Sequence, residues 1–124
     1  MRRTFWVAAC GLVAHIGLLL GASMPCSIHA AKTSSKEELA ARAKVTEPDA
    51  RAAALAALKV NRARAAVKES ELEVEEGCLV YSYDIRVAGE KGVREVLVDA
   101  GNGKVLKTEH ESEAGEKKEK AEKP

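Results

Sequence analysis

The sequence is poor in aromatic residues, with one Trp, one Phe and two Tyr among 124 residues. Phe5 and Trp6 lie in an N-terminal stretch that reads as a leader, so Tyr81 and Tyr83 are the only aromatics left for a folded domain. A chain of this length has room for one small domain with a mainly aliphatic core. We expect modest stability.

The sequence also lacks an excess of either charge and a set of catalytic residues. Its 20 Lys+Arg and 19 Asp+Glu give a formal net charge of +1, which argues against nucleic acid as a partner because that role needs a concentrated basic face. Only His110 follows residue 30, so neither a Ser/His/Asp nor a Cys/His set is available. We predict a protein that is not an enzyme and needs no cofactor.

Residues 1–30 have the pattern of a secretory signal peptide. Arg2 and Arg3 precede an apolar run over residues 5–21, and small residues follow Pro25. The sequence predicts cleavage after Ala30 or Ala31 and export to the periplasm or the medium. The alternative is a membrane anchor over residues 5–22, and only an uncleaved segment would place the protein at a membrane.

Cysteine is scarce, with three residues in the chain. Cleavage after Ala30 removes Cys10 and Cys26, so Cys78 would be the only cysteine left and no intramolecular disulfide could form. Lipidation of Cys26 is disfavoured because Pro25 precedes it. Cys78 would then be an exposed free thiol or the link of a covalent dimer, and its glutamate neighbours argue against high reactivity.

Two helices are predicted before residue 60. Residues 31–45 form a polar lead-in with a short helix at Glu37–Ala43, capped by Ser34 or Ser35. Thr46 then starts a second helix whose alanine-rich face can lie close to a sheet. Asn61 is a candidate left-handed end for that helix.

Four strands follow the helices. Residues 79–87 alternate apolar and polar side chains, which is typical of a half-buried antiparallel strand. Residues 65–75, 93–99 and 104–106 supply the other strands, and Glu76-Gly77 and Gly103 supply turns. The sequence therefore predicts an α+β fold with one or two N-terminal helices packed on a four-stranded antiparallel sheet, and a disordered charged tail over residues 110–124.

Two features of the predicted strands are candidate ligand sites. The glutamates of residues 69–75 share one strand face, but without His or Cys neighbours they fit a solvated face better than a metal site. Tyr81 and Tyr83 occupy an inward strand face, where a core role is favoured over a ligand pocket.

The Ala-rich helix, the glutamate-bearing strand, the Tyr81–Tyr83 strand and the closing run Val96–Leu106 together resemble the PepSY domain over residues 46–109. Asn102 replaces the threonine usual in that closing run. The resemblance implies a small exported module related to the propeptides of thermolysin-type peptidases, with no catalytic residues. The residues that carry the motif, as structural positions, are Tyr81, Tyr83, Val96, Val98, Asp99, Ala100, Gly103 and Val105.

The resemblance favours a non-enzymatic binding module that modulates or inhibits an envelope or secreted peptidase. Pairing through an unpaired edge strand would provide the contact. The alternatives are a small envelope protein that binds a ligand or a metal, and a partner protein that acts through the Cys78 thiol.

Overall fold

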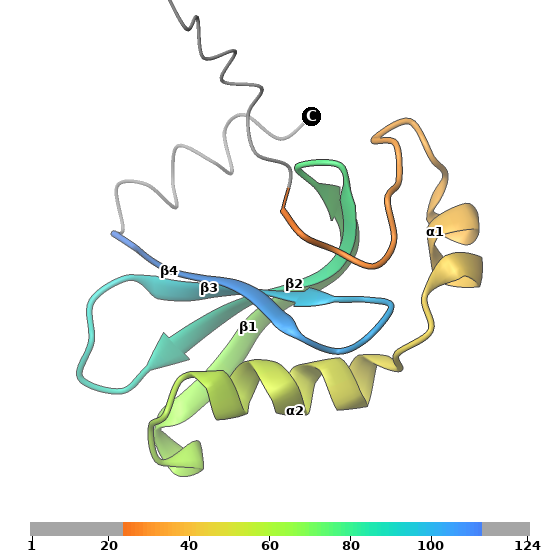
Figure 1. The fold of residues 1–124 in the computed structure, drawn as a ribbon. Coiled ribbons are helices and arrows are strands. Elements are labelled where there is room, and N and C mark those ends of the chain that lie inside the picture. Colours follow the sequence, from red (N-terminus) through yellow and green to blue (C-terminus); the bar gives the residue numbers. More distant parts are fainter. Residues whose placement is uncertain (1–23, 113–124) are drawn as a thin grey trace, which may run out of the picture.

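In the computed structural model, which describes residues 24–112, two helices pack on one face of a four-stranded antiparallel sheet (Figure 1). The predicted α+β fold is confirmed. The apolar run of the leader and residues 113–124 of the predicted tail lie outside the described residues. In chain order the elements are α1 (Lys36–Arg42), α2 (Glu47–Ala57), a 3-10 turn η1 (Arg62–Arg64), β1 (Ala65–Glu75), β2 (Cys78–Val87), β3 (Val93–Asp99) and β4 (Val105–Glu111).

Both helices begin where side chains satisfy free backbone donors. Ser35 and Glu38 form a reciprocal capping box at the start of α1. The Thr46 hydroxyl accepts a hydrogen bond from the Asp49 N–H at the start of α2. At the end of α2 the left-handed residue is Lys59, with φ 53°, and not the predicted Asn61, whose side chain instead caps η1.

The sheet is a meander with strand order β1-β2-β3-β4. Glu75 pairs with Cys78, so Glu76 and Gly77 form a two-residue hairpin turn, and both have the positive φ that such a turn requires (48° and 80°). Both central residues of this turn were identified from the sequence.

The helices and the facing side of the sheet enclose the main core. Alternate β2 residues from Leu79 to Val87 and the β3 residues Val96 and Val98 meet Ala50 and Ala54 of α2. These two alanines are fully buried, so the helix axis lies close to the sheet. The alternation in residues 79–87 therefore predicted the correct inward face.

The two tyrosines are core residues with their hydroxyls bonded at its rim. Tyr81 donates to the Val45 carbonyl at 2.8 Å, and Tyr83 donates to the Glu47 carbonyl at 3.2 Å. Burial, with a smaller contribution from Glu47, raises the pKa of both phenols. Their predicted role as core residues is confirmed.

Strand β4 is longer than the sequence indicated. It continues to Glu111, which pairs with Val93, although the predicted strand ended at Leu106 and the tail was expected from residue 110. Backbone pairing with β3 stabilises this edge strand although most of its side chains remain at least partly exposed.

Between residues 24 and 112, no helix is both long enough and apolar enough to span a bilayer. The candidate anchor over residues 5–22 lies outside the described residues.

Candidate functional site

Residues 24–30, which we call the N-terminal arm, lie beside the start of β2 (Figure 1, orange). The Leu79 N–H donates to the Ile28 carbonyl at 2.9 Å, and the Ala30 N–H donates to the Gly77 carbonyl at 2.9 Å. His29 and Cys78 form an isolated antiparallel bridge. The arm therefore extends the sheet where β3 has already ended.

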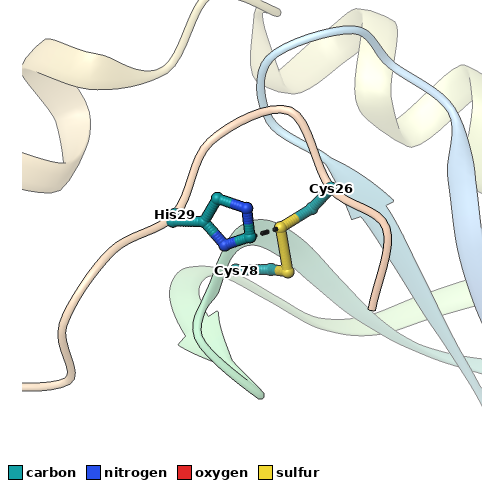
Figure 2. A group of neighbouring side chains, drawn as sticks. All are labelled: Cys26, His29 and Cys78. Carbon is teal, nitrogen blue, oxygen red and sulfur yellow. Dashed lines mark hydrogen bonds between the residues drawn. A yellow bond between two sulfur atoms is a disulfide. The ribbon is translucent and has the colours of Figure 1, made fainter. Parts of the chain in front are cut away.

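A disulfide joins the arm to β2. Cys26 and Cys78 are bonded, with their Cα atoms 5.9 Å apart and 52 positions between them in the sequence. Figure 2 shows the His29 ring beside this bond, with Nδ1 3.7 Å from the Cys26 sulfur. In the described chain Cys78 therefore has a partner, whereas the prediction of an unpaired Cys78 was made for a chain without residues 1–30.

Cys78 is also buried and not exposed as the strand alternation predicted. Cys78, Val80 and Leu97 form a second cluster on the face of the sheet away from the helices, covered by Met24, Cys26 and Leu106. The sequence interpretation left this face open to solvent because it assigned Met24 and Cys26 to a removed leader. While the disulfide is closed and Met24 and Cys26 cover it, Cys78 presents no free thiol; the covalent dimer and the thiol-dependent partner stay predictions for a chain that lacks residues 24–30.

Asp99, at the end of β3, ties the arm to the β3–β4 turn. Its carboxylate accepts hydrogen bonds from the Ser27 N–H (2.7 Å) and hydroxyl (2.5 Å), and from the N–H groups of Gly101 (2.7 Å) and Asn102 (3.3 Å). Burial alone would raise the pKa of Asp99, but these donors outweigh it and lower the pKa below its ordinary value. The ionised Asp99 carboxylate therefore holds the β3–β4 turn and the arm together by accepting hydrogen bonds from both.

Gly101 marks the closest approach of the arm to the turn. A Cβ on Gly101 would lie 2.9 Å from Cγ1 of Ile28 and would overlap the Ser27 hydroxyl oxygen. The requirement for glycine here comes from the arm and not from a positive φ. Gly103 differs, since its φ is 75° and its place in the turn was predicted.

The structure divides the eight motif residues between the core and the turn. Asp99, Ala100 and Gly103 build the turn, and Ala100 accepts hydrogen bonds from the Lys44 and Val45 N–H groups that precede α2. Val105 is 36% exposed. The remaining four lie in the helix-covered core: Tyr81, Tyr83, Val96 and Val98.

Strand β1 is an outer strand of the sheet, and its glutamates lie on the face away from the helices. In the register, Glu71 pairs with Ser82, Glu73 with Val80 and Glu75 with Cys78, whereas Leu72 and Val74 pair with inward residues of β2. The acidic side of β1 therefore flanks the surface covered by the arm.

Among residues 24–112, one group of side chains has the composition of a metal site. The ligand atoms of Cys26, His29 and Cys78 lie within 4.8 Å of one another. Both sulfurs are joined in the disulfide, so in this oxidised chain the imidazole of His29 is the one group of the three that can act as a metal ligand. His110, the other described histidine, bonds the Lys91 carbonyl through Nε2 at 2.7 Å.

The geometry defines a small α+β module whose sheet is covered by helices on one side and closed at one end by a disulfide-linked arm. Residues 44–109 match the sequence model of the PepSY family, the peptidase propeptide and YPEB domain, and the chain belongs to this family. No curated protein and no solved structure matches the chain. The match begins after α1, so the arm lies outside it.

The sequence interpretation found the residues of the core and the turn but missed the arm. One signal was present in the sequence: an even pair of cysteines, Cys26 and Cys78, remains if the leader ends before Met24.

Proposed function

We propose that the protein is an exported, non-enzymatic module that binds a peptidase of the cell envelope and restrains its activity. The observation that carries the proposal is the match of residues 44–109 to a peptidase propeptide family. Propeptide-type modules act by binding, which agrees with a domain whose β3–β4 turn is held by hydrogen bonds to Asp99 and presents no catalytic group.

We propose β1 as the contact strand. It is eleven residues long, and among residues 24–112 it is an edge strand of the sheet, paired with β2 on one side. An extended peptidase cleft can pair with such an edge through main-chain hydrogen bonds. Glu71 and Glu73 would favour a cleft with basic surroundings and would make association sensitive to salt.

The test is inhibition of purified envelope metallopeptidases by the full exported chain. We expect inhibition that weakens as salt increases, and a loss of at least about tenfold in affinity for Glu71→Lys/Glu73→Lys, because like charges then face the basic cleft. Glu109→Lys/Glu111→Lys, a double charge reversal of the same size on the opposite edge strand β4, should leave affinity within about twofold.

Two results would remove the proposal: no envelope metallopeptidase binds the chain, or the β4 variant loses as much affinity as the β1 variant. The first result would reject the peptidase partner. The second would reject β1 as the contact strand.

A second candidate function is binding of a thiophilic metal ion by the reduced chain. Around tetrahedral zinc, with Zn–S about 2.3 Å and Zn–N about 2.0–2.1 Å, sulfur and nitrogen ligands lie about 3.5 Å apart. The Cys26 sulfur and His29 Nδ1 are 3.7 Å apart, close to that spacing. A dithiol reductant would convert the disulfide to two thiols and become a disulfide itself, and the metal would then displace both thiol protons.

Zinc titration of the full exported chain, with and without prior dithiol reduction, tests this candidate. The reduced chain should bind one zinc ion and the oxidised chain none. His29→Ala should weaken binding by about tenfold or more, whereas His110→Ala should not, because His110 lies away from the cysteines. Equal binding by oxidised and reduced chains would reject the site.

A further inference from the structure

We infer that the exported protein keeps residues 24–30, and that signal peptidase therefore cuts the chain at the Ser23–Met24 bond or before it. This differs from the cleavage after Ala30 or Ala31 predicted from the sequence. The inference is independent of any peptidase partner, because it follows from what the arm does within the fold.

The first argument is the backbone. Leu79 is fully buried, and its N–H donates to the Ile28 carbonyl. Removal of the arm takes away the protein partner of this donor and leaves the edge of β2 unpaired at this point. Buried backbone groups are paired in native structures, so the arm supplies the partner that the burial of Leu79 in the full chain requires.

The second argument is the apolar surface under the arm. Cys78 and Val80 are fully buried and Leu97 is 2% exposed, with Met24 and Cys26 packed against them. Ile28 belongs to the core on the helix side. A chain beginning at Ala31 would expose an apolar patch and a free thiol on the same face.

The third argument is the Asp99 turn. A cut after Ala30 removes two of the four hydrogen bonds to a fully buried carboxylate, both of them from Ser27. An ionised buried group that loses donors is destabilising. The space that Gly101 leaves open is filled by Ser27 and Ile28, and would otherwise be empty.

The sequence before the arm contains a suitable processing site. Gly21 and Ser23 place small residues three and one positions before the Ser23–Met24 bond, as signal peptidase requires. A leader of 23 residues lies within the usual range of about 15–30. Cys10 would leave with it, and Cys26 would remain as the partner of Cys78.

The experiment is to express the full chain in a bacterium with an oxidising periplasm, isolate the exported protein, and measure its intact mass and alkylated thiols under denaturing conditions. We expect a mass that begins at Met24 or slightly before it. No thiol should be labelled before reduction and two after it, since Cys26 and Cys78 are paired.

The other outcomes overturn the inference. A product that begins at Ala31 or Lys32 has one cysteine, which is labelled equally before and after reduction or links a covalent dimer. An uncleaved chain has three cysteines, with one labelled before reduction and three after it. Each of these results rejects the proposed cut.

A matched pair of variants locates the processing site even where folding is affected, because mass alone is read. Gly21→Leu/Ser23→Leu should block the cut and leave the leader attached, because bulky residues replace the required small ones. Ala30→Leu/Ala31→Leu should leave the new N-terminus unchanged. The opposite pattern would place the cut at the end of the arm and overturn the inference.

Discussion

The two faces of the sheet are covered in different ways. The helix side is covered by α1 and α2, and the β2 side chains that face these helices alternate along the strand. The other face is covered near the β1–β2 hairpin by the N-terminal arm, which is held by the Cys26–Cys78 disulfide. The helices are held on the sheet mainly by apolar contacts. The arm makes fewer apolar contacts and is also held by the disulfide and by hydrogen bonds to β2 and Asp99.

The two covers also differ in their position relative to the part of the chain that matches the PepSY family. The helix-side core formed by α2 and the sheet lies almost entirely within the match at residues 44–109, whereas the arm precedes it. The arm covers the start of β2 and fixes the turn after β3 through Asp99. A segment outside the matched residues therefore completes the core of the domain.

The largest expected effect is on the helix side. Tyr83→Ala should lower the free energy of unfolding by about 3–5 kcal/mol, because it removes a fully buried aromatic ring. Urea unfolding at neutral pH measures this. Tyr83→Phe, which removes only the hydrogen bond to the Glu47 carbonyl, should lower it by about 1 kcal/mol. If both variants have the same effect, the ring does not dominate this core.

Loss of the disulfide should come next. Closing a loop of 52 residues stabilises a domain by about 4 kcal/mol in the chain-entropy model. Reduction of a chain that contains residues 24–124 should therefore shift the urea midpoint downward, and Cys26→Ser/Cys78→Ser should show a low midpoint that the reductant does not change. A wild-type midpoint that is equally insensitive to reductant would mean that the arm adds little stability.

Gly101→Ala should lower the free energy of unfolding by about 1–3 kcal/mol, because the added methyl group overlaps the arm. Ser27→Gly removes the nearest atom, so the Gly101→Ala effect should be smaller in that background. Urea unfolding of the four chains gives the coupling energy. Purely additive effects would show that the two residues are not in contact.

Substitution of Asp99 should have a smaller effect at neutral pH than Tyr83→Ala or loss of the disulfide, and it should change the dependence of stability on acid. Its folded-state pKa is below the ordinary value of 3.8, so its ionised form stabilises the fold above that pH, and this contribution is lost as pH falls below 3.8. Asp99→Asn should lower the free energy of unfolding by about 1–2 kcal/mol at pH 7. Because the variant has no carboxylate at this position, its free energy of unfolding should fall less steeply with decreasing pH than that of the wild type. Parallel acid titrations of the two chains would contradict this assignment.

Much of the helix side was predictable because its signals are local. Alternation in residues 79–87 identified the buried face, Thr46 and the pair Ser34/Ser35 marked helix starts, and Glu76-Gly77 marked a tight turn. The length of β4 was not predictable, since pairing with β3 stabilises residues 107–111 without apolar side chains of their own. The left-handed end of α2 at Lys59 was also missed, because lysine has no special preference for positive φ.

The sequence by itself determined the fold class, the inward face of β2, the turns and the family, because each depends on spacing within a few residues. Only the tertiary structure shows that Cys78 can pair with Cys26 and that residues 24–30 contact β2 and Asp99. Those residues have no periodic pattern, and a short polar stretch with a proline reads as the end of a leader. Their partners Cys78 and Asp99 lie more than 50 positions away, so the contacts exist only after the sheet has formed.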